Sequence, residues 1–384
     1  MRHFNKLKYH VITLKKIFKI LPVLIPFFGF SQKGKQAIDS IIVRQQDSTK
    51  IKKVSFNGYP YIFYTPETEA AFGAGGIALF YTKKSETLRP SKIGFGAYYT
   101  SNDQYKFSIK PSIYFNSNNL VINMPVSYGY RVDKFWGIGN NTIDSGTEQY
   151  LRQDFEFELE VQVPPILLFS DRAGLIIEYK NTDIVDGKNN EFINNELVNG
   201  SKGGNIFGIG LNLLWDRRDN LFYPTSGHFQ SIKFIVHPEP SDFIYTTFEL
   251  DARYYKEFKK DQVFATNLYV KSVGKNAPFY ELPALGGQNR MRGYFLGRYR
   301  DQTYAMLQGE YRQYFWKRFG FVAFAGIGDV GEEIINLNIG ELKYSYGGGL
   351  RYLFNKKEKV NFRMDVGIGK DGNTGIYFGI EESF

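Results

Sequence analysis

The segment Gly286–Asp301, "GGQNRMRGYFLGRYRD", concentrates charge and backbone freedom in one place. It contains four arginines and four glycines. An arginine guanidinium is a planar fork of N–H donors that suits carboxylates, and glycine allows tight turns that other residues resist. The segment therefore raises the question of whether acidic side chains elsewhere in the chain receive one of its arginines.

Residue types for catalysis or metal binding are sparse in the rest of the chain. There is no cysteine, and of the four histidines only His228 and His237 lie after residue 31. A lipid hydrolase would need a serine activated by a histidine, but His228 shares a strand face with Ile232 and Phe234 and is better explained as an interfacial residue. No metal-ligand spacing and no phosphate-binding glycine motif occur. The sequence therefore predicts no catalytic residue, no metal and no cofactor.

The elements that must position Gly286–Asp301 alternate between apolar and polar residues. Charged and amide side chains form one face of Arg152–Val163, and the other face is apolar: Phe155, Phe157, Leu159, Val161 and Val163. Val360–Gly369 repeats this pattern, as does Asn205–Asp216 with a few exceptions. Successive side chains of a strand point to opposite faces, so these segments are two-faced strands.

A soluble sandwich would also alternate, with its apolar face buried. A membrane barrel is favoured because the polar faces carry charge and glycine, and because the strands are about 10 to 14 residues long, which suits a tilted crossing of a bilayer. Backbone groups in a bilayer must pair within the protein, so such strands close into a barrel. We predict an all-β fold, a transmembrane antiparallel barrel of about 16 strands. The last strand is expected at residues 375–384, and the long connections at residues 134–149, 182–202, 274–300 and 331–341.

Residues 1–31 are predicted to be a cleaved secretory signal peptide. They contain six basic residues, no acidic residue and an apolar stretch from Ile17 to Phe30, with Gly29 and Ser31 before a cleavage point ahead of Gln32. The apolar stretch is too short for a membrane anchor. Without these residues the net charge of +9 falls to about +3, which gives no argument for nucleic-acid binding. Residues 32–56 are expected to be a short periplasmic linker, and residues 57–384 the barrel domain.

Four motifs follow one another along the predicted barrel. They are "YTPETEAAFGAG" from Tyr64, "WDRRDNLFYPTSGHF" from Trp215, "NRMRGY" with Arg292, Gly293 and Tyr294, and "GIGDVG" with Asp329. Through them, residues 59–384 resemble the bacterial surface antigen superfamily of outer-membrane barrels, which includes the BamA and TamA insertases and the FhaC-type transporters. The resemblance implies a multi-pass barrel of the bacterial outer membrane.

The resemblance also implies roles for these motifs. In that family the sixth extracellular loop folds back into the lumen, and its tip arginine pairs with acids on the two strands that follow. Arg292 is therefore expected inside the barrel, with Glu310 and Asp329 as its acidic partners. The second motif is expected to be a periplasmic turn, with Asp216, Arg218, Asp219, Pro224 and Gly227. The remaining arginines of the loop are expected in water or on lumenal acids: Arg290, Arg298 and Arg300.

The seam between the first and last strands is expected to be weak. Pro60 cannot donate to a sheet ladder and belongs on an edge, and Gly379 weakens the last strand. The family uses such a seam as a lateral gate, although an ordinary closure with a tolerated proline is the alternative. Phe384 is expected to end the last strand with the aromatic residue that the assembly machinery reads.

One departure from the family concerns the segment before the barrel, because residues 32–56 are too few for a POTRA domain. The leading hypothesis is a non-enzymatic barrel that assists insertion or translocation of protein or lipid. A passive channel or structural scaffold is the alternative, and a lipid hydrolase is a third. The expected partners are outer-membrane lipids, the barrel assembly machinery during biogenesis, and separate periplasmic or surface proteins, with no nucleic acid.

Overall fold

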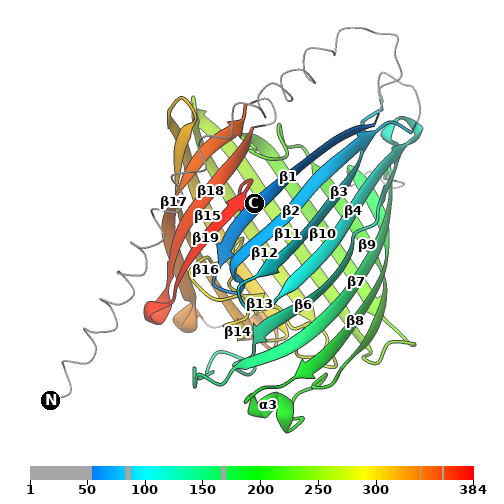
Figure 1. Cartoon of the computed structure of the whole chain (residues 1–384), viewed down its shortest axis with the longest axis vertical. Coiled ribbons are helices and arrows are strands. Elements are labelled where there is room, and N and C mark those ends of the chain that lie inside the picture. Colours follow the sequence, from blue (N-terminus) through cyan, green and yellow to red (C-terminus); the bar gives the residue numbers. More distant parts are fainter. Residues whose placement is uncertain (1–53, 83–87, 166–169, 338, 357–358) are drawn as a thin grey trace, which may run out of the picture. The chain divides into compact units, whose positions relative to one another are not determined.

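The computed structural model describes residues 54–82, 88–165, 170–337, 339–356 and 359–384. The predicted signal peptide and nearly all of the predicted linker lie outside the described residues. Strands dominate the described part (Figure 1). They are β1 Ser55–Thr65, β2 Glu69–Phe80, β3 Ser91–Thr100, β4 Tyr105–Phe115, β5 Leu120–Asn123, β6 Val126–Lys134, β7 Gln149–Val163, β8 Arg172–Asp186, β9 Gly203–Asp216, β10 Ser226–His237, β11 Tyr245–Lys259, β12 Gln262–Val273, β13 Ala284–Leu285, β14 Tyr299–Arg300, β15 Thr303–Trp316, β16 Phe319–Gly331, β17 Lys343–Asn355, β18 Val360–Gly369 and β19 Thr374–Ile380.

Helical segments in the described residues are short. They are α3 Glu191–Asn194 and the 3₁₀ turns η4 Asn116–Asn118, η5 Ile334–Asn336, η6 Ile339–Glu341 and η7 Lys370–Gly372. Across the described ranges, no helix has the length and apolar character needed to cross a bilayer.

The strands pair antiparallel with their neighbours in sequence, and two local departures occur. β5 and β6 are one strand interrupted at Met124 and Pro125, because both pair with β4 and with β7. β13 and β14 form a separate pair inside the connection between β12 and β15. Of the nineteen strands, sixteen units thus build the wall of the barrel. The predicted fold class is confirmed.

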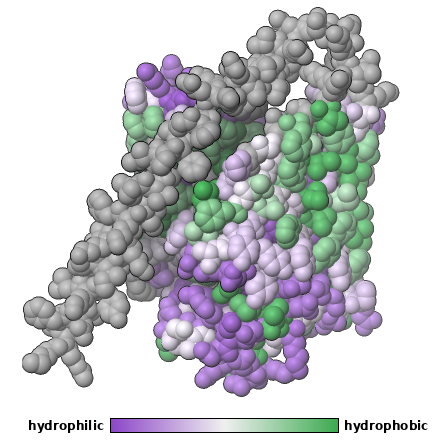
Figure 2. All heavy atoms as spheres, viewed as in Figure 1, coloured by the Kyte–Doolittle hydropathy of each residue, from purple (hydrophilic) through white to green (hydrophobic). Residues whose placement is uncertain are grey.

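The two predicted faces are present on the barrel wall. The outward face carries exposed apolar side chains, among them Leu211 at 61%, Phe234 at 51% and Leu350 at 60% exposure. The lumenal face of β7 carries buried charges such as Arg152 and Glu160. Figure 2 shows the apolar surface over the strands and hydrophilic side chains over the loops at the lower end. The period-two pattern of the sequence thus sets which side chains meet lipid and which meet the lumen.

Antiparallel alternation gives the barrel two unlike ends. We call one the long-loop end, because it holds the connections 135–148, 187–202, 274–302 and 332–342. We call the other the short-turn end, where β11–β12 and β15–β16 are joined by residues 260–261 and 317–318. The long-loop end is the lower one in Figure 1. Its loops pack together around a buried apolar cluster that includes Phe135, Tyr150, Ile193, Phe279 and Tyr280.

Candidate functional site

The connection between β12 and β15 enters the barrel and places its tip against the inner wall. Gly293 has φ of 115°, and a Cβ there would lie 2.8 Å from the backbone nitrogen of Gly369. The wall makes room in return, since a Cβ on Gly367 of β18 would lie 2.6 Å from the carbonyl oxygen of Arg292. The loop tip therefore fits only where glycine stands on both sides of the contact.

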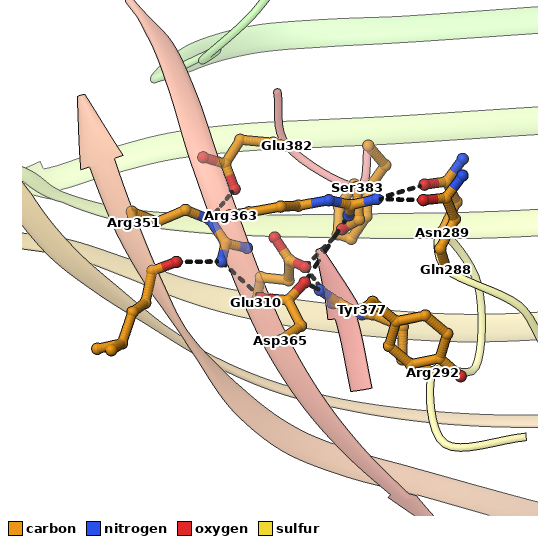
Figure 3. A network of polar contacts seen from close by, with 12 residues as sticks. Gln288, Asn289, Arg292, Glu310, Arg351, Arg363, Asp365, Tyr377, Glu382 and Ser383 are labelled. Carbon is orange, nitrogen blue, oxygen red and sulfur yellow. Dashed lines mark hydrogen bonds and ion pairs between the residues drawn. The ribbon is translucent and has the colours of Figure 1, made fainter. Parts of the chain in front are cut away.

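Arg292 lies at the centre of a buried polar network (Figure 3). Its side chain is 1% exposed, and its Nη1 donates to Asp365 Oδ2 at 2.6 Å. Its Nη2 donates to Glu310, and its guanidinium stacks 3.6 Å from the ring centroid of Phe324. Charge-assisted bonds to two acids from one planar fork fix both position and orientation.

The two acids predicted for Arg292 are in different places. Glu310 contacts Arg292. Asp329 accepts a hydrogen bond from Lys343 Nζ at 2.7 Å and is fully buried, so its expected role as a partner of Arg292 is corrected. Asp365 takes that place, because β18 presents it to the lumen beside the loop tip. The alternation of Val360–Gly369 assigns Asp365 to the polar face, but it does not indicate which loop lies opposite.

Further arginines extend the network across the lumen. Glu310 also accepts from Arg312 Nε at 2.8 Å, and Asp365 also accepts from Arg351 Nη1 at 2.5 Å. Arg351 Nε donates to Glu382 at 2.7 Å. Each central acid thus keeps a second guanidinium besides that of Arg292. The arrangement is a set of interlocked ion pairs in which no single contact holds the loop alone.

The other loop arginines have different partners. Arg290 Nη2 lies 3.3 Å from Asp251 of β11, as expected for a lumenal acid. Arg298 donates to the hydroxyl and the carbonyl of Thr142, and Arg300 donates to the carbonyls of Phe279 and Lys134. Arg298 is half-buried, and Arg300 lies near the Asp133 carboxylate of β6, so each is compatible with the expectation of water or lumenal acids. Both also tie loops together through oxygen atoms of the backbone and of Thr142.

The segment after β19 turns into the lumen instead of extending the strand. β19 ends at Ile380, Glu381 has φ of 72°, and Phe384 is 6% exposed in a cluster with Tyr255 and Ala265. The strand expected to run to residue 384 is therefore shorter. The physical reason is that Ser383 Oγ donates to Glu310 at 2.6 Å and Glu382 binds Arg351, so the tail meets partners in the network. Whether the assembly machinery reads Phe384 remains a prediction.

Contacts of the loop reach both sides of the barrel seam. On the β19 side, Gly293 N donates to the Tyr377 hydroxyl at 3.0 Å, and that hydroxyl donates to the Tyr294 carbonyl at 3.2 Å. On the β1 side, Leu296 N donates to Glu67 Oε1 at 2.8 Å in the β1–β2 turn. Burial raises the pKa of the Glu67 carboxyl above its ordinary value. The loop is thus a bridge between the first and last strands.

The seam itself differs from every other junction of the wall. β1 and β19 lie next to each other, yet no hydrogen-bonded register joins them in the described residues. Pro60 is an exposed residue of β1 and pairs with Ala74 on β2. Gly379 pairs with Arg363 on β18, and a Cβ there would lie 3.0 Å from Arg363 Nε. Each of these two strands therefore has one paired edge.

The predicted turn motif closes part of the short-turn end. Arg218 binds Asp216 at 2.8 Å, and Asp219 accepts from Thr225 N at 2.8 Å and Ser226 N at 3.0 Å. Burial raises the pKa of Asp219, but its hydrogen bonds, first of all from the Thr225 hydroxyl, outweigh this and hold the pKa below its ordinary value.

Two further residues of the motif frame the turn at the short-turn end. Pro224 precedes its last hydrogen-bonded residues, and Gly227 pairs with Tyr255 at the start of β10. Between Asp219 and Pro224, the Tyr223 side chain is 3% exposed, and its ring centroid lies 5.2 Å from that of Tyr314.

A cavity of about 560 Å³ remains inside the barrel, lined by residues outside the Arg292 network. Its charged lining is balanced, with five lysines and five glutamates: Lys106, Lys110, Lys180, Lys233, Lys271, Glu156, Glu158, Glu178, Glu249 and Glu281. His237 lies beside this region, is 1% exposed and has Nε2 2.9 Å from Glu178, so it is a structural residue. No group of three or more His, Cys, Asp or Glu side chains in the described ranges is placed to hold a metal ion.

Known proteins share this architecture. Residues 76–384 match the model of the Omp85 superfamily domain. BamA from Haemophilus ducreyi lacking POTRA domains 1–3 is similar in structure, with a TM-score of 0.59 and 13% identity, over 90% of this chain and 78% of that one. CdiB from Acinetobacter baumannii has a TM-score of 0.58 and 12% identity, over 86% of this chain and 60% of that one. No curated protein matches the sequence.

The family match covers most of the chain, and both solved structures share the barrel fold. The resemblance stated from the four motifs is therefore confirmed. The chain belongs to the Omp85 superfamily of outer-membrane barrels.

Proposed function

We propose that this barrel assists the insertion or translocation of protein or lipid through its β1–β19 seam, without enzymatic chemistry of its own. The observation that carries the proposal is the unpaired seam: β1 and β19 are neighbours without a ladder, and the Arg292 loop contacts both sides of it. A loop that bridges the seam from inside can hold it shut or let it open.

The energetics of an open edge support this role. Backbone groups that face hydrocarbon without a partner cost several kcal/mol each. An unpaired β1 edge is therefore a template for any extended segment that supplies the missing hydrogen bonds. A client strand or a lipid headgroup at the seam would lower this cost, whereas the fifteen other junctions are already occupied by ladders.

The surroundings of the barrel follow from the same proposal. An even number of strands puts both ends of the barrel domain on one side, which we assign to the periplasm together with the short-turn end. Separate periplasmic or surface proteins would deliver the client. Export by a cleaved signal peptide, and recognition of Phe384 by the assembly machinery before folding, complete the proposal.

The test is a reversible crosslink across the seam. Cysteine pairs between β1 residues 60–64 and β19 residues 376–380 would be scanned for a disulfide, with Leu350→Cys and Met364→Cys as the matched control in the intact β17–β18 ladder. The assays are folding of an unfolded β-barrel protein into liposomes that contain the chain, and lipid exchange between leaflets.

We expect the seam disulfide to stop both activities and reduction to restore them, while the control disulfide leaves them unchanged. Normal activity in a fully crosslinked seam variant would rule out the seam. The alternative of a passive channel is favoured by the cavity of about 560 Å³. A channel would keep the same single-channel conductance with the seam crosslinked.

A further inference from the structure

Three neighbouring hairpins at the short-turn end carry an excess of positive charge. They join β11 to β12, β15 to β16 and β17 to β18. We call their basic residues the basic rim: Lys256, Lys259, Lys260, Lys317, Arg318, Lys356 and Lys359. The described acidic residues of these hairpins are Glu257 and Asp261. The rim is therefore strongly cationic over this side of the barrel.

The basic rim is continuous in space. Tyr314 N donates to Asp261 O at 3.2 Å, which joins the first hairpin to the second. Leu353 N donates to Arg318 O at 2.8 Å, which joins the second hairpin to the third. Strands in a sheet lie about 4.8 Å apart, so the six strands of these hairpins spread the rim over an arc of roughly 25 Å.

Within the described ranges the basic rim has few partners inside the protein: Arg318 Nη1 donates to the carbonyls of Leu353 and Phe354, and Lys359 lies near the Asp219 carboxylate. The ion pairs of the described residues include none with a member of the rim. Basic residues of the same end on the β8–β10 side behave differently: Arg217 binds Asp171 at 3.2 Å and Arg218 binds Asp216 at 2.8 Å. The cationic side chains of the rim are therefore available to an anionic partner outside the chain.

A band of aromatic side chains lies next to the basic rim on the outward face. Phe315 and Trp316 are each 58% exposed, and Phe258 is 50% exposed. Trp316 stacks on Phe319 at 5.6 Å between ring centroids, and Lys317 Nζ lies 5.3 Å from the Trp316 ring. Aromatic residues gather at the level of the headgroups in membrane barrels. This band therefore sets the basic rim at headgroup depth (upper end in Figure 1).

We propose that the basic rim is a binding surface for anionic phospholipid headgroups. A lysine or arginine near a membrane surface improves binding to anionic lipid by about fivefold, and the effect is lost beyond the screening length of the salt. Several such residues on one arc would gather anionic phospholipid on the β11–β18 side. This inference does not depend on the proposed function or on which leaflet meets the short-turn end.

The natural tryptophans supply the test. Trp316 lies in the band beside the rim, whereas Trp215 of β9 lies beside Arg217 at the same end and Trp136 is only 4% exposed, in the loops of the other end. The full chain would be placed in phosphatidylethanolamine vesicles with equal amounts of brominated phosphatidylglycerol or brominated phosphatidylethanolamine. Trp215→Phe leaves Trp316 as the tryptophan that can report on the rim, and Trp316→Phe leaves Trp215 as the reference, while buried Trp136 adds the same background to both.

We expect brominated phosphatidylglycerol to quench Trp316 several-fold more than brominated phosphatidylethanolamine at low salt, with a smaller difference at Trp215. In 1 M salt, where the screening length is about 3 Å, the preference should vanish. Lys259→Gln, Lys260→Gln, Lys317→Gln and Lys356→Gln together should abolish it as well. If this variant does not fold, the first two and the last two substitutions are tested as separate pairs, each of which should reduce the preference.

The matched control removes lysines at the opposite end: Lys188→Gln, Lys202→Gln and Lys275→Gln. We expect this variant to keep the full preference. Equal quenching by the two lipids in the unaltered chain would overturn the proposal, and would point instead to an acidic protein as the occupant of the rim. A preference that survives the four substitutions in the rim, or that disappears in the control, would overturn it too.

Discussion

Replacement of Arg292 by methionine is the perturbation whose effect can be worked out most fully. The change keeps much of the side-chain length and removes the guanidinium that binds Glu310 and Asp365. All three side chains are no more than 1% exposed, so the remaining acids cannot be solvated. Breaking a buried ion pair of this kind costs about 3–5 kcal/mol.

The lower end of that range applies here because neither acid is left alone. Glu310 retains Arg312 and Ser383, and Asp365 retains Arg351. We therefore expect Arg292→Met to weaken docking of the loop by about 3 kcal/mol, which is more than a hundredfold in the docking equilibrium. Arg292→Lys should weaken docking less than Arg292→Met does, but still measurably, since an ammonium group cannot bind both acids as a fork.

Trp136 reports on the loop directly. Its ring lies 5.5 Å from that of Phe295 in the loop, and it is 4% exposed. With Trp215 and Trp316 replaced by phenylalanine, acrylamide should quench Trp136 more strongly in Arg292→Met, and proteases should cleave within residues 274–302. The control for stability in urea is Arg298→Met, which breaks hydrogen bonds with Thr142 and no ion pair, at an expected cost of about 1 kcal/mol. Arg298 also lies 5.5 Å from the Trp136 ring, so this control is not read by Trp136 quenching.

If Arg292→Met unfolds in urea with a free energy within about 0.5 kcal/mol of the unaltered chain, and if Trp136 is equally protected from acrylamide, the network does not hold the loop. The same conclusion would follow if Arg298→Met lowered the free energy of unfolding more than Arg292→Met did.

Three further predictions concern the wall, a turn and the orientation. Gly367→Ala should displace the loop tip, because its Cβ would lie 2.6 Å from the Arg292 carbonyl oxygen. Gly94→Ala, whose Cβ would have its nearest neighbour at 3.8 Å, should leave the loop in place. Acrylamide quenching of Trp136 measures both. Asp219→Asn should destabilise the barrel at pH 7 by about 1 kcal/mol through its lost charged hydrogen bonds. The Asp219 carboxyl has a lowered pKa in the folded state, so its contribution to stability is present above its unfolded pKa and is lost as the pH falls through the folded pKa. Urea titrations should therefore give the variant and the unaltered chain the same free energy of unfolding below about pH 4. Cysteines in residues 188–195 should react with impermeant reagents on intact cells and those in residues 220–225 should not, and reversed labelling would overturn the orientation.

Much of the wall could be predicted from sequence because lipid and lumen impose a strict period of two on each strand. The alternation of Val360–Gly369 assigns Asp365 to the lumenal face, where the structure has it. The contact between Asp365 and Arg292 was missed because a strand pattern does not indicate which loop faces it across the lumen. Glu310 was found through the motif resemblance and strand parity together.

The course of the chain after β19 could not be predicted from the alternation. The apolar alternation of β19 predicts a strand that runs to residue 384, since Phe384 continues the outward series from Ile376. The tail turns inward because three of its residues contact a network built from distant strands, with Glu310 and Arg351 among its members. Local periodicity gives no information on such long-range partners. Asp329 was misassigned for the same reason, because Lys343, which pairs with Gly328 on the neighbouring strand, binds it.

Amide hydrogen exchange in a bilayer tests the central claim most directly, namely that the seam is held by the loop and not by a ladder. The account predicts that amides of β1 and β19 at the seam exchange faster than those of β17 and β18, whose ladder runs from Ser345↔Gly369 to Asn355↔Val360. It also predicts a further increase at the seam alone in Arg292→Met. Equal protection of β1, β19, β17 and β18 in the unaltered chain, or a seam that does not respond to Arg292→Met, would contradict the account.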